Sequence, residues 1–322
     1  MEVLRLYPEP KPIDIGGRPD NDPPVFEAVN LYKVPQAFIS SYGYVIRNLK
    51  VLKEGISFRH RNSVIFRNIL SFVLLKKKRR ISKPCLSIAN GWYNSYYHFT
   101  LESLPKLFLL KDYIGTSVLV FPADTSPFHE QWFKILGIRN IQPVADNEIV
   151  KTPLAITTNF ASRDLNHHDL VMPRFRDWVL SHINTKDAAL HKKIFIGRKN
   201  PRYRILLNNP EAKEMLAESG FVYLEMEDFS VEHQVALFNY AEQIVCVHGA
   251  ALTNICFCRP GTKIIDLMHE DFKQWCFLKL ALVLGLDYTI LPCAGPQKNG
   301  ELPGHRDISV HLPALKQLIE KW

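Results

Sequence analysis

A histidine and a glutamate four residues apart form the first pair whose types and spacing suit chemistry. His98 and Glu102 lie in a segment, residues 90–111, whose second part has the pattern of a helix. If that helix begins near Ser95, the two side chains share one face. A carboxylate beside an imidazole can serve as a general base, because each group orients the other and tunes its affinity for a proton. The same spacing also occurs in purely structural pairs, so spacing alone leaves both interpretations open.

A second polar group follows two apolar runs in the C-terminal half. Residues 244–247 lead into His248-Gly249-Ala250-Ala251-Leu252-Thr253-Asn254, and the next apolar run ends at Asp266. A turn of small residues into a helix presents N–H groups to an anion. The carboxylate of Asp266 could accept hydrogen bonds from sugar hydroxyls. A tight strand-to-helix turn that holds no ligand is the alternative interpretation.

Alternating strands and helices must position this second group. Runs rich in β-branched and aromatic residues predict five strands, at 194–196, 221–224, 244–247, 264–265 and 288–291. Helices are expected from Asn209, from Ser230, after Gly249 and over residues 272–284. Such repeats predict an α/β fold with a parallel, doubly wound sheet. Ligands bind such sheets beyond the carboxyl ends of the strands, where we expect Arg198, His248 and Asp266.

Length and composition favour two domains. The chain has 322 residues, 47% of them hydrophobic, which is enough for two cores. Its formal charge of +8 suggests an acidic partner such as a nucleotide, a polyanionic glycan or an anionic membrane surface. The six cysteines lack paired zinc spacings, and this predicts buried free thiols and no metal site.

The N-terminal half also contains an apolar stretch joined to cations. Residues 64–75 are too short to cross a bilayer and run into Lys76-Lys77-Lys78-Arg79-Arg80. Residues 64–80 could therefore contact an anionic membrane surface. The alternatives are a β-hairpin with a solvated basic turn and, less favoured because no aromatic residues alternate with the charges, a nucleic-acid patch.

The chain is expected to divide into four parts. These are an irregular arm (1–25), an acceptor-side domain (26–186), a nucleotide-sugar-binding domain (187–295), and an extension (296–322) whose helix packs back on the N-terminal domain. No signal peptide pattern opens the sequence, which favours the cytoplasm, with the inner membrane face as a peripheral site.

Several of these segments, taken in order, resemble glycosyltransferase family 61. Members of that family build plant xylan, modify secreted proteins or serve capsular polysaccharide synthesis in bacteria. The resemblance covers roughly residues 85–292. The matching segments are Tyr97-His98-Phe99-Thr100-Leu101-Glu102 with Pro105, Ile196-Gly197-Arg198, Arg204-Ile205-Leu206-Leu207-Asn208, Gly220-Phe221, Phe229-Ser230 with Gln234, residues 248–254, Phe257, Pro260-Gly261 and Asp266.

The resemblance implies a GT-B fold, with two Rossmann-like domains facing a central cleft, and an inverting, metal-independent transfer from a nucleotide-sugar, by default a UDP-sugar. It implies no cofactor, and as acceptor a glycan or lipid-linked glycan. Glu102 is expected as the base with His98 as its partner, and the reverse assignment is nearly as good. The expected donor-binding residues are Arg198, Arg204, His248, Gly249, Ala250, Ala251, Leu252, Asn254 and Asp266, the last standing where the family more often has glutamate.

Two other classes of function compete with the enzyme. One is a non-catalytic module that binds a nucleotide or a glycan on the same fold, and loss of the His98 and Glu102 pair would mark it. The other is a nucleic-acid-binding protein that uses Lys76 to Arg80, for which duplex binding would depend steeply on salt. Both members of the pair are present, so the enzyme is favoured and no nucleic acid is expected.

Overall fold

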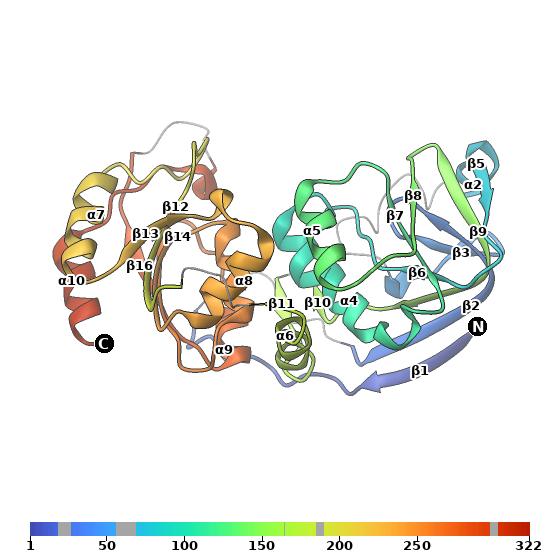
Figure 1. The fold of residues 1–322 in the computed structure, drawn as a ribbon, viewed down its shortest axis with the longest axis horizontal. Coiled ribbons are helices and arrows are strands. Elements are labelled where there is room, and N and C mark those ends of the chain that lie inside the picture. The colour runs from blue at the N-terminus through green and yellow to red at the C-terminus, as the bar shows by residue number, and fades with distance from the viewer. Residues whose placement is uncertain (19–26, 56–68, 164, 185–189, 297–301) are drawn as a thin grey trace. The chain divides into compact units, whose positions relative to one another are not determined.

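The computed structural model describes the chain except for residues 19–26, 56–68, 164, 185–189 and 297–301 (Figure 1). The described chain divides into two compact units, an N-terminal unit, Met1–His182, and a C-terminal unit, Ile183–Trp322. Both combine helices with sheets that contain parallel strands, as the α/β prediction requires.

The N-terminal unit is built on a mixed sheet. Among its described residues nine strands pair, in the order β4-β3-β2-β9-β6-β7-β8 with β1 on β2 and β5 on β9. The strands β5 to β9 pair in parallel, whereas β1 to β4 and the β2–β9 pair are antiparallel. The strands are β1 (Glu2–Tyr7), β2 (Val29–Ser40), β3 (Val45–Arg47), β4 (Lys50–Val51), β5 (Lys77–Arg80), β6 (Cys85–Ser87), β7 (Val118–Pro122), β8 (Ile141–Val144) and β9 (Glu148–Thr158).

Short helices and one small hairpin complete this unit. The α-helices are α2 (Ile69–Leu75), α3 (Tyr96–His98), α4 (Leu104–Leu109), α5 (Pro127–Ile135) and α6 (Met172–Leu180), and β10 (Ser162–Arg163) pairs with β11 (Asn166–His167). A π-helical turn, η3 (Phe99–Ser103), joins α3 to α4. The β-hairpin alternative for the basic segment is wrong, because α2 leads into β5, which pairs in parallel with β9. Residues 64–68 of that segment lie outside the described part.

The C-terminal unit is a five-stranded parallel sheet in the order β13-β12-β14-β15-β16. All five strands predicted from the sequence are present, as β12 (Lys193–Gly197), β13 (Val222–Glu225), β14 (Gln243–Val247), β15 (Lys263–His269) and β16 (Asp287–Cys293). The helices are α7 (Asn209–Glu218), α8 (Val231–Tyr240), α9 (Cys276–Leu284) and α10 (Leu312–Glu320). Figure 1 shows α7 and α10 on one face of the sheet and α8 and α9 on the other. The helix predicted after Gly249 is a 3-10 helix, η6 (Ala250–Phe257).

The last helix packs on the C-terminal unit. Leu315 of α10 is fully buried in a core shared with β12, β14, β15 and α7, and Leu312 and Leu318 pack against that core. The carbonyl of Trp322 accepts a hydrogen bond from Lys263 Nζ at 2.7 Å. The expectation that this helix packs back on the N-terminal domain is therefore wrong, because its apolar face completes the core beside α7.

All six cysteines are free and buried, as predicted. In the part of the chain that the structure describes, no helix is long and apolar enough to cross a membrane.

Candidate functional site

A π-helical turn positions the histidine–glutamate pair of the N-terminal unit. Ser95 precedes α3 in extended conformation, so the helix begins where the sequence predicts. The turn η3 is a π-helix of five residues between α3 and α4, and π-helical turns are rare and recur at functional sites. Nδ1 of His98 lies 3.0 Å from Oε1 of Glu102. The predicted juxtaposition of the two side chains is confirmed.

A buried amide holds the second oxygen of Glu102. Asn90 Nδ2 donates to Glu102 Oε2 at 2.8 Å, and Asn90 Oδ1 accepts from the N–H of Trp92 at 2.8 Å. The Glu102 side chain is 5% exposed and that of His98 is 23% exposed. The carboxylate is thus fixed in orientation, while the imidazole reaches solvent. The sequence does not predict that Asn90 contacts Glu102, because nothing in its spacing indicates that the loop after β6 folds back on this carboxylate.

The aromatic residues around this pair divide into core and surface. Tyr93 packs edge-on against Phe121, and Tyr97 is likewise buried. Trp92 remains 40% exposed, with its ring centroid 5.9 Å from that of His98. Trp92 is therefore the aromatic residue of this group whose surface is most available to stack on a sugar ring.

Two polar residues of the C-terminal unit, Arg198 and His248, lie where the strand order reverses. The chain runs from β12 outward to β13 and then crosses to β14 on the other side of β12. Arg198 directly follows β12, and His248 directly follows β14. A crevice beyond the carboxyl ends of two such strands is the general ligand site of open parallel sheets.

Two arginines lie at this reversal point. A Cβ added to Gly249 would lie 3.5 Å from Arg198 Nε, so the guanidinium passes close over the glycine backbone. Arg198 and Arg204 line a cavity of about 120 Å³ together with Gly197 and Val247. Burial, then the neighbouring Arg198, lower the pKa of Arg204 to about 10, which leaves it cationic at neutral pH. An anion here would relieve the repulsion between the two cations.

Arg204 is held in an unusual conformation. Its φ of 57° is left-handed, which is uncommon for a residue other than glycine. The loop is fastened to the C-terminal extension, since the Arg204 N–H donates to the His305 carbonyl at 3.3 Å and the Ile205 N–H donates to Asp307 Oδ1 at 2.9 Å. Tyr203 stacks on His305 with ring centroids 4.1 Å apart. The sequence does not predict a place for the extension at this edge, because the contact joins segments about a hundred residues apart.

Asp266 holds His248 and does not reach solvent. β15 continues to His269, so the expectation that Asp266 lies beyond the carboxyl end of its strand is wrong. The Asp266 side chain is 1% exposed, and its Oδ2 lies 2.7 Å from His248 Nδ1 and accepts from Tyr288 Oη at 2.7 Å. Burial and Asp266 raise the pKa of Tyr288 well above its usual range, which keeps the phenol as a donor. The sheet register that brings Tyr288 to Asp266 could not be seen in the sequence.

The turn after β14 leads directly into the 3-10 helix η6. The first bond of η6 runs from the Leu252 N–H to the Gly249 carbonyl at 3.0 Å, so the N–H groups of Ala250 and Ala251 belong to the unbonded first turn. Asn254 lies deeper and is fully buried, where its Nδ2 donates to Gln234 Oε1 at 2.9 Å. Asn254 therefore fastens η6 to α8.

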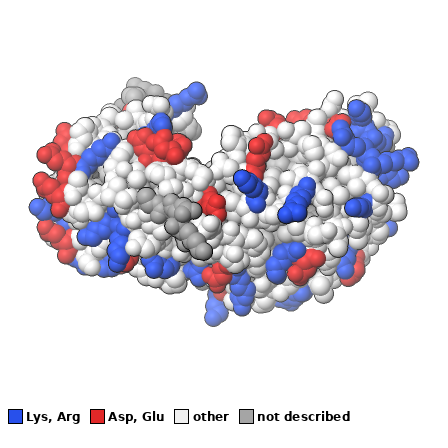
Figure 2. All heavy atoms as spheres, in the orientation of Figure 1, with Lys and Arg blue, Asp and Glu red and all other residues white. Residues whose placement is uncertain are grey.

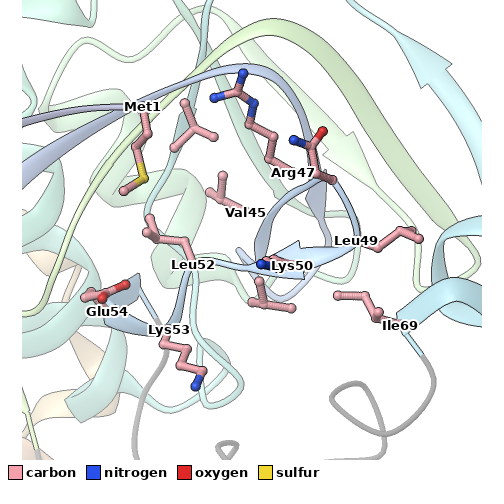
Figure 3. Close-up of a pocket in the computed structure, with 12 residues that line it drawn as sticks. Met1, Val45, Arg47, Leu49, Lys50, Leu52, Lys53, Glu54 and Ile69 are labelled. Atoms are coloured by element: carbon pink, nitrogen blue, oxygen red, sulfur yellow. The ribbon is translucent and has the colours of Figure 1, made fainter.

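A further cavity of about 720 Å³ lies in the N-terminal unit, around β3 and β4 (Figure 3). Most of its lining is apolar, as with Val45, Leu52 and Ile69. It is larger than the cavity beside Arg198, and among its described lining residues no ion pair joins Glu54 to a cation. Among the described residues, no three His, Cys, Asp or Glu side chains gather as metal ligands.

Comparison with known proteins identifies a family for the chain. A search of curated proteins finds no match to the chain. The sequence model of the family described as Glycosyltransferase 61 matches residues 96–265, over half of the chain. This range contains His98, Glu102, Arg198, Arg204 and His248, and it ends one residue before Asp266. The chain therefore belongs to the glycosyltransferase 61 family and is a glycosyltransferase.

Proposed function

We propose that the protein is an inverting, metal-independent glycosyltransferase of GT-B organisation, which moves a sugar from a nucleotide-sugar to a hydroxyl of a glycan or lipid-linked glycan. A UDP-sugar, the cytoplasm and cell-surface polysaccharide synthesis are the defaults that the family suggests. The observation that carries the donor site is the placement of Arg198 and the His248-Gly249 turn at the strand-order reversal between β12 and β14. In the N-terminal unit, the His98 and Glu102 pair supports acid–base chemistry.

The proposed donor site neutralises the departing diphosphate with two guanidinium groups and with backbone amides. Arg198 and Arg204 supply positive charge, and the N–H groups of Ala250 and Ala251 supply oriented dipoles. His248, Gly249 and Leu252 shape this turn, Asn254 anchors it, and Asp266 acts through His248 as a positioning residue. In this arrangement the charge that develops on the leaving group meets groups already fixed in place.

Glu102 is proposed as the base in the N-terminal unit. As the acceptor oxygen forms its bond to the anomeric carbon, the bond from that carbon to the diphosphate oxygen breaks and the hydroxyl proton passes to Glu102. Attack from the face opposite the leaving group inverts the anomeric centre. Asn90 and His98 orient the carboxylate, and the alternative is that His98 accepts the proton while Glu102 orients it. The GT-B organisation is needed for the base and the donor to meet.

Tyr203 is a further part of the proposed donor site. It is 45% exposed, it stacks on His305, and its carbonyl accepts from Arg198 Nη1 at 2.7 Å. An exposed ring fastened to a phosphate-binding arginine suits a nucleobase. We therefore propose that Tyr203 stacks against the base of the donor.

Calorimetric titration with UDP, GDP and CMP, with and without EDTA, tests the donor site. We expect binding of one nucleotide that EDTA leaves unchanged and that Arg198→Ala weakens at least about tenfold, since a charge-assisted hydrogen bond is lost. Arg259→Ala is the matched control. This arginine is exposed and precedes β15, so it lies near the amino ends of the strands, whereas Arg198 follows the carboxyl end of β12. Failure of all three nucleotides to bind, or equal loss in both variants, would overturn the assignment.

A further inference from the structure

The end of helix α2 presents two leucines to solvent. Ile69 and Val73 of this helix pack on a small core with Ile46 of β3. Leu74 and Leu75, at the C-terminal end, are 60% and 85% exposed. Single exposed leucines are common on protein surfaces. Here two consecutive leucines are exposed at the end of a helix whose other side is buried, and together they form an apolar surface that favours contact with another apolar environment.

Strand β5 follows these leucines directly and divides its four cations between two faces. Lys77 and Arg79 both turn toward Glu148, with nitrogen-to-oxygen distances of 3.8 and 2.8 Å. Side chains alternate along a strand, so Lys78 and Arg80 point to the opposite face. Within the described part of the chain, no carboxylate lies at ion-pair distance from either of these two. One face of β5 is thus neutralised internally and the other keeps its charge.

The apolar and cationic groups lie close together. Leu75 and Lys78 are three residues apart, so no more than about 10 Å of chain separates them. Figure 2 shows Lys and Arg side chains gathered at the end of the N-terminal unit that carries α2 and β5 in Figure 1. The neighbouring cavity, which Ile69 lines, adds Arg47, Lys50 and Lys53 to this end of the unit (Figure 3).

We propose that Leu74, Leu75, Lys78 and Arg80, the α2–β5 patch, bind the surface of a bilayer that contains anionic lipids. The leucines enter the boundary between headgroups and acyl chains, and the two cations meet lipid phosphates. The cations alone would be enough to prevent this strand from pairing with another chain, and that role would leave the exposed leucines without a function. A nucleic acid would likewise leave the leucines in water. This inference does not depend on the proposed function.

Sedimentation of the full chain with lipid vesicles tests the patch. We expect the protein to sediment with vesicles of phosphatidylcholine and phosphatidylglycerol at low salt and to stay in solution with phosphatidylcholine alone. Lys78→Gln with Arg80→Gln should weaken binding about 30-fold, because each cation near an anionic surface contributes a factor of about five. Leu74→Ser with Leu75→Ser should weaken it at least about tenfold, since apolar area stays in water.

Matched controls lie in the C-terminal unit. Lys316→Gln with Lys321→Gln removes two exposed lysines, and Leu282→Ser removes a leucine that is 45% exposed. Both should sediment as the unmodified protein does. Unchanged nucleotide binding and circular dichroism in every variant separate a failed patch from a failed fold or donor site. The proposal is overturned if the unmodified protein stays in solution with anionic vesicles, or if the leucine variant binds as well as the unmodified protein.

Discussion

The candidate site of each unit contains an imidazole beside a carboxylate, and these two pairs differ in what surrounds them. In the N-terminal unit, His98 lies 3.0 Å from Glu102 and is 23% exposed. In the C-terminal unit, His248 lies 2.7 Å from Asp266 and is 3% exposed. A pair that reaches solvent can exchange a proton with a substrate, whereas a buried pair fixes the turn that follows it. We therefore propose that an imidazole beside a carboxylate serves chemistry in the N-terminal unit and positions a turn in the C-terminal unit.

The largest effect is expected at Glu102. Glu102→Gln keeps the size of the side chain and removes the base, so the transfer rate should fall by about 10²- to 10⁴-fold. Nucleotide affinity should not change, because the donor site belongs to the other unit. Steady-state kinetics and calorimetry measure the two quantities. His98→Gln serves as the partner measurement, since a greater loss there than in Glu102→Gln would assign the base to the histidine.

Lys106 tests how burial changes an ionisable group close to the N-terminal pair. It lies one turn beyond Glu102 and is fully buried. Burial lowers its pKa to about 7, and its Nζ lies 4.4 Å from the centroid of Phe160. In the unfolded chain the amine keeps its proton to higher pH, so between pH 7 and the ordinary lysine range the unfolded state binds more protons. Lys106 should therefore contribute to the free energy of unfolding a rise of roughly 2 kcal/mol between pH 7 and pH 9. Buried thiols such as Cys85, whose pKa is raised by burial, contribute in the opposite direction, so the rise is read as the difference between the unmodified protein and Lys106→Met.

Urea denaturation at several pH values measures this rise. Lys106→Met should remove the rise, and Lys134→Met, which alters an exposed lysine of α5, should keep it. An identical pH dependence in Lys106→Met and the unmodified protein would contradict the burial argument.

Asp266→Asn breaks the buried pair. It removes the charged acceptor of His248 and Tyr288, so the free energy of unfolding should fall by about 1 to 2 kcal/mol and nucleotide affinity by about tenfold. In contrast to Glu102→Gln, this variant should therefore weaken donor binding. Denaturation and calorimetry report both values. Full affinity in a destabilised variant would mean that Asp266 supports the sheet without positioning the donor turn.

Tyr288→Phe has the smallest expected effect. It removes one neutral donor from Asp266 Oδ2, and stability should fall by about 1 kcal/mol with little change in nucleotide affinity. Thermal unfolding monitored by circular dichroism detects such a difference. A loss as large as that in Asp266→Asn would show that the phenol, and not the imidazole, is the main partner of this carboxylate.

The two units also differ in how far the sequence predicts them. The five parallel strands of the C-terminal unit are apolar runs bounded by turns, and each was predicted. The order in which they pair, which creates the reversal between β12 and β14, depends on long-range contacts. The antiparallel strands β1 to β4 were not predicted, since β2 contains Pro35 and lacks regular alternation.

The candidate site shows the same limit. Spacing along one helix predicts that His98 meets Glu102, because the contact is local. Asn90 reaches Glu102 from a loop twelve residues earlier, and Tyr288 reaches Asp266 from a neighbouring strand. The C-terminal extension was misplaced for a related reason. The apolar face of α10 predicts that the helix packs on something, but cannot say on which core.

The buried thiols provide an unequal set of reporters for the two units. Cys85 is the one cysteine of the N-terminal unit, and the other five belong to the C-terminal unit. A thiol-reactive probe can modify these side chains only when the surrounding structure opens. The mass of the intact protein after a brief exposure would then give the number of adducts. Opening of the N-terminal unit adds one adduct, and opening of the C-terminal unit adds up to five. The chain thus carries, without any added label, a means of measuring the opening of each half separately.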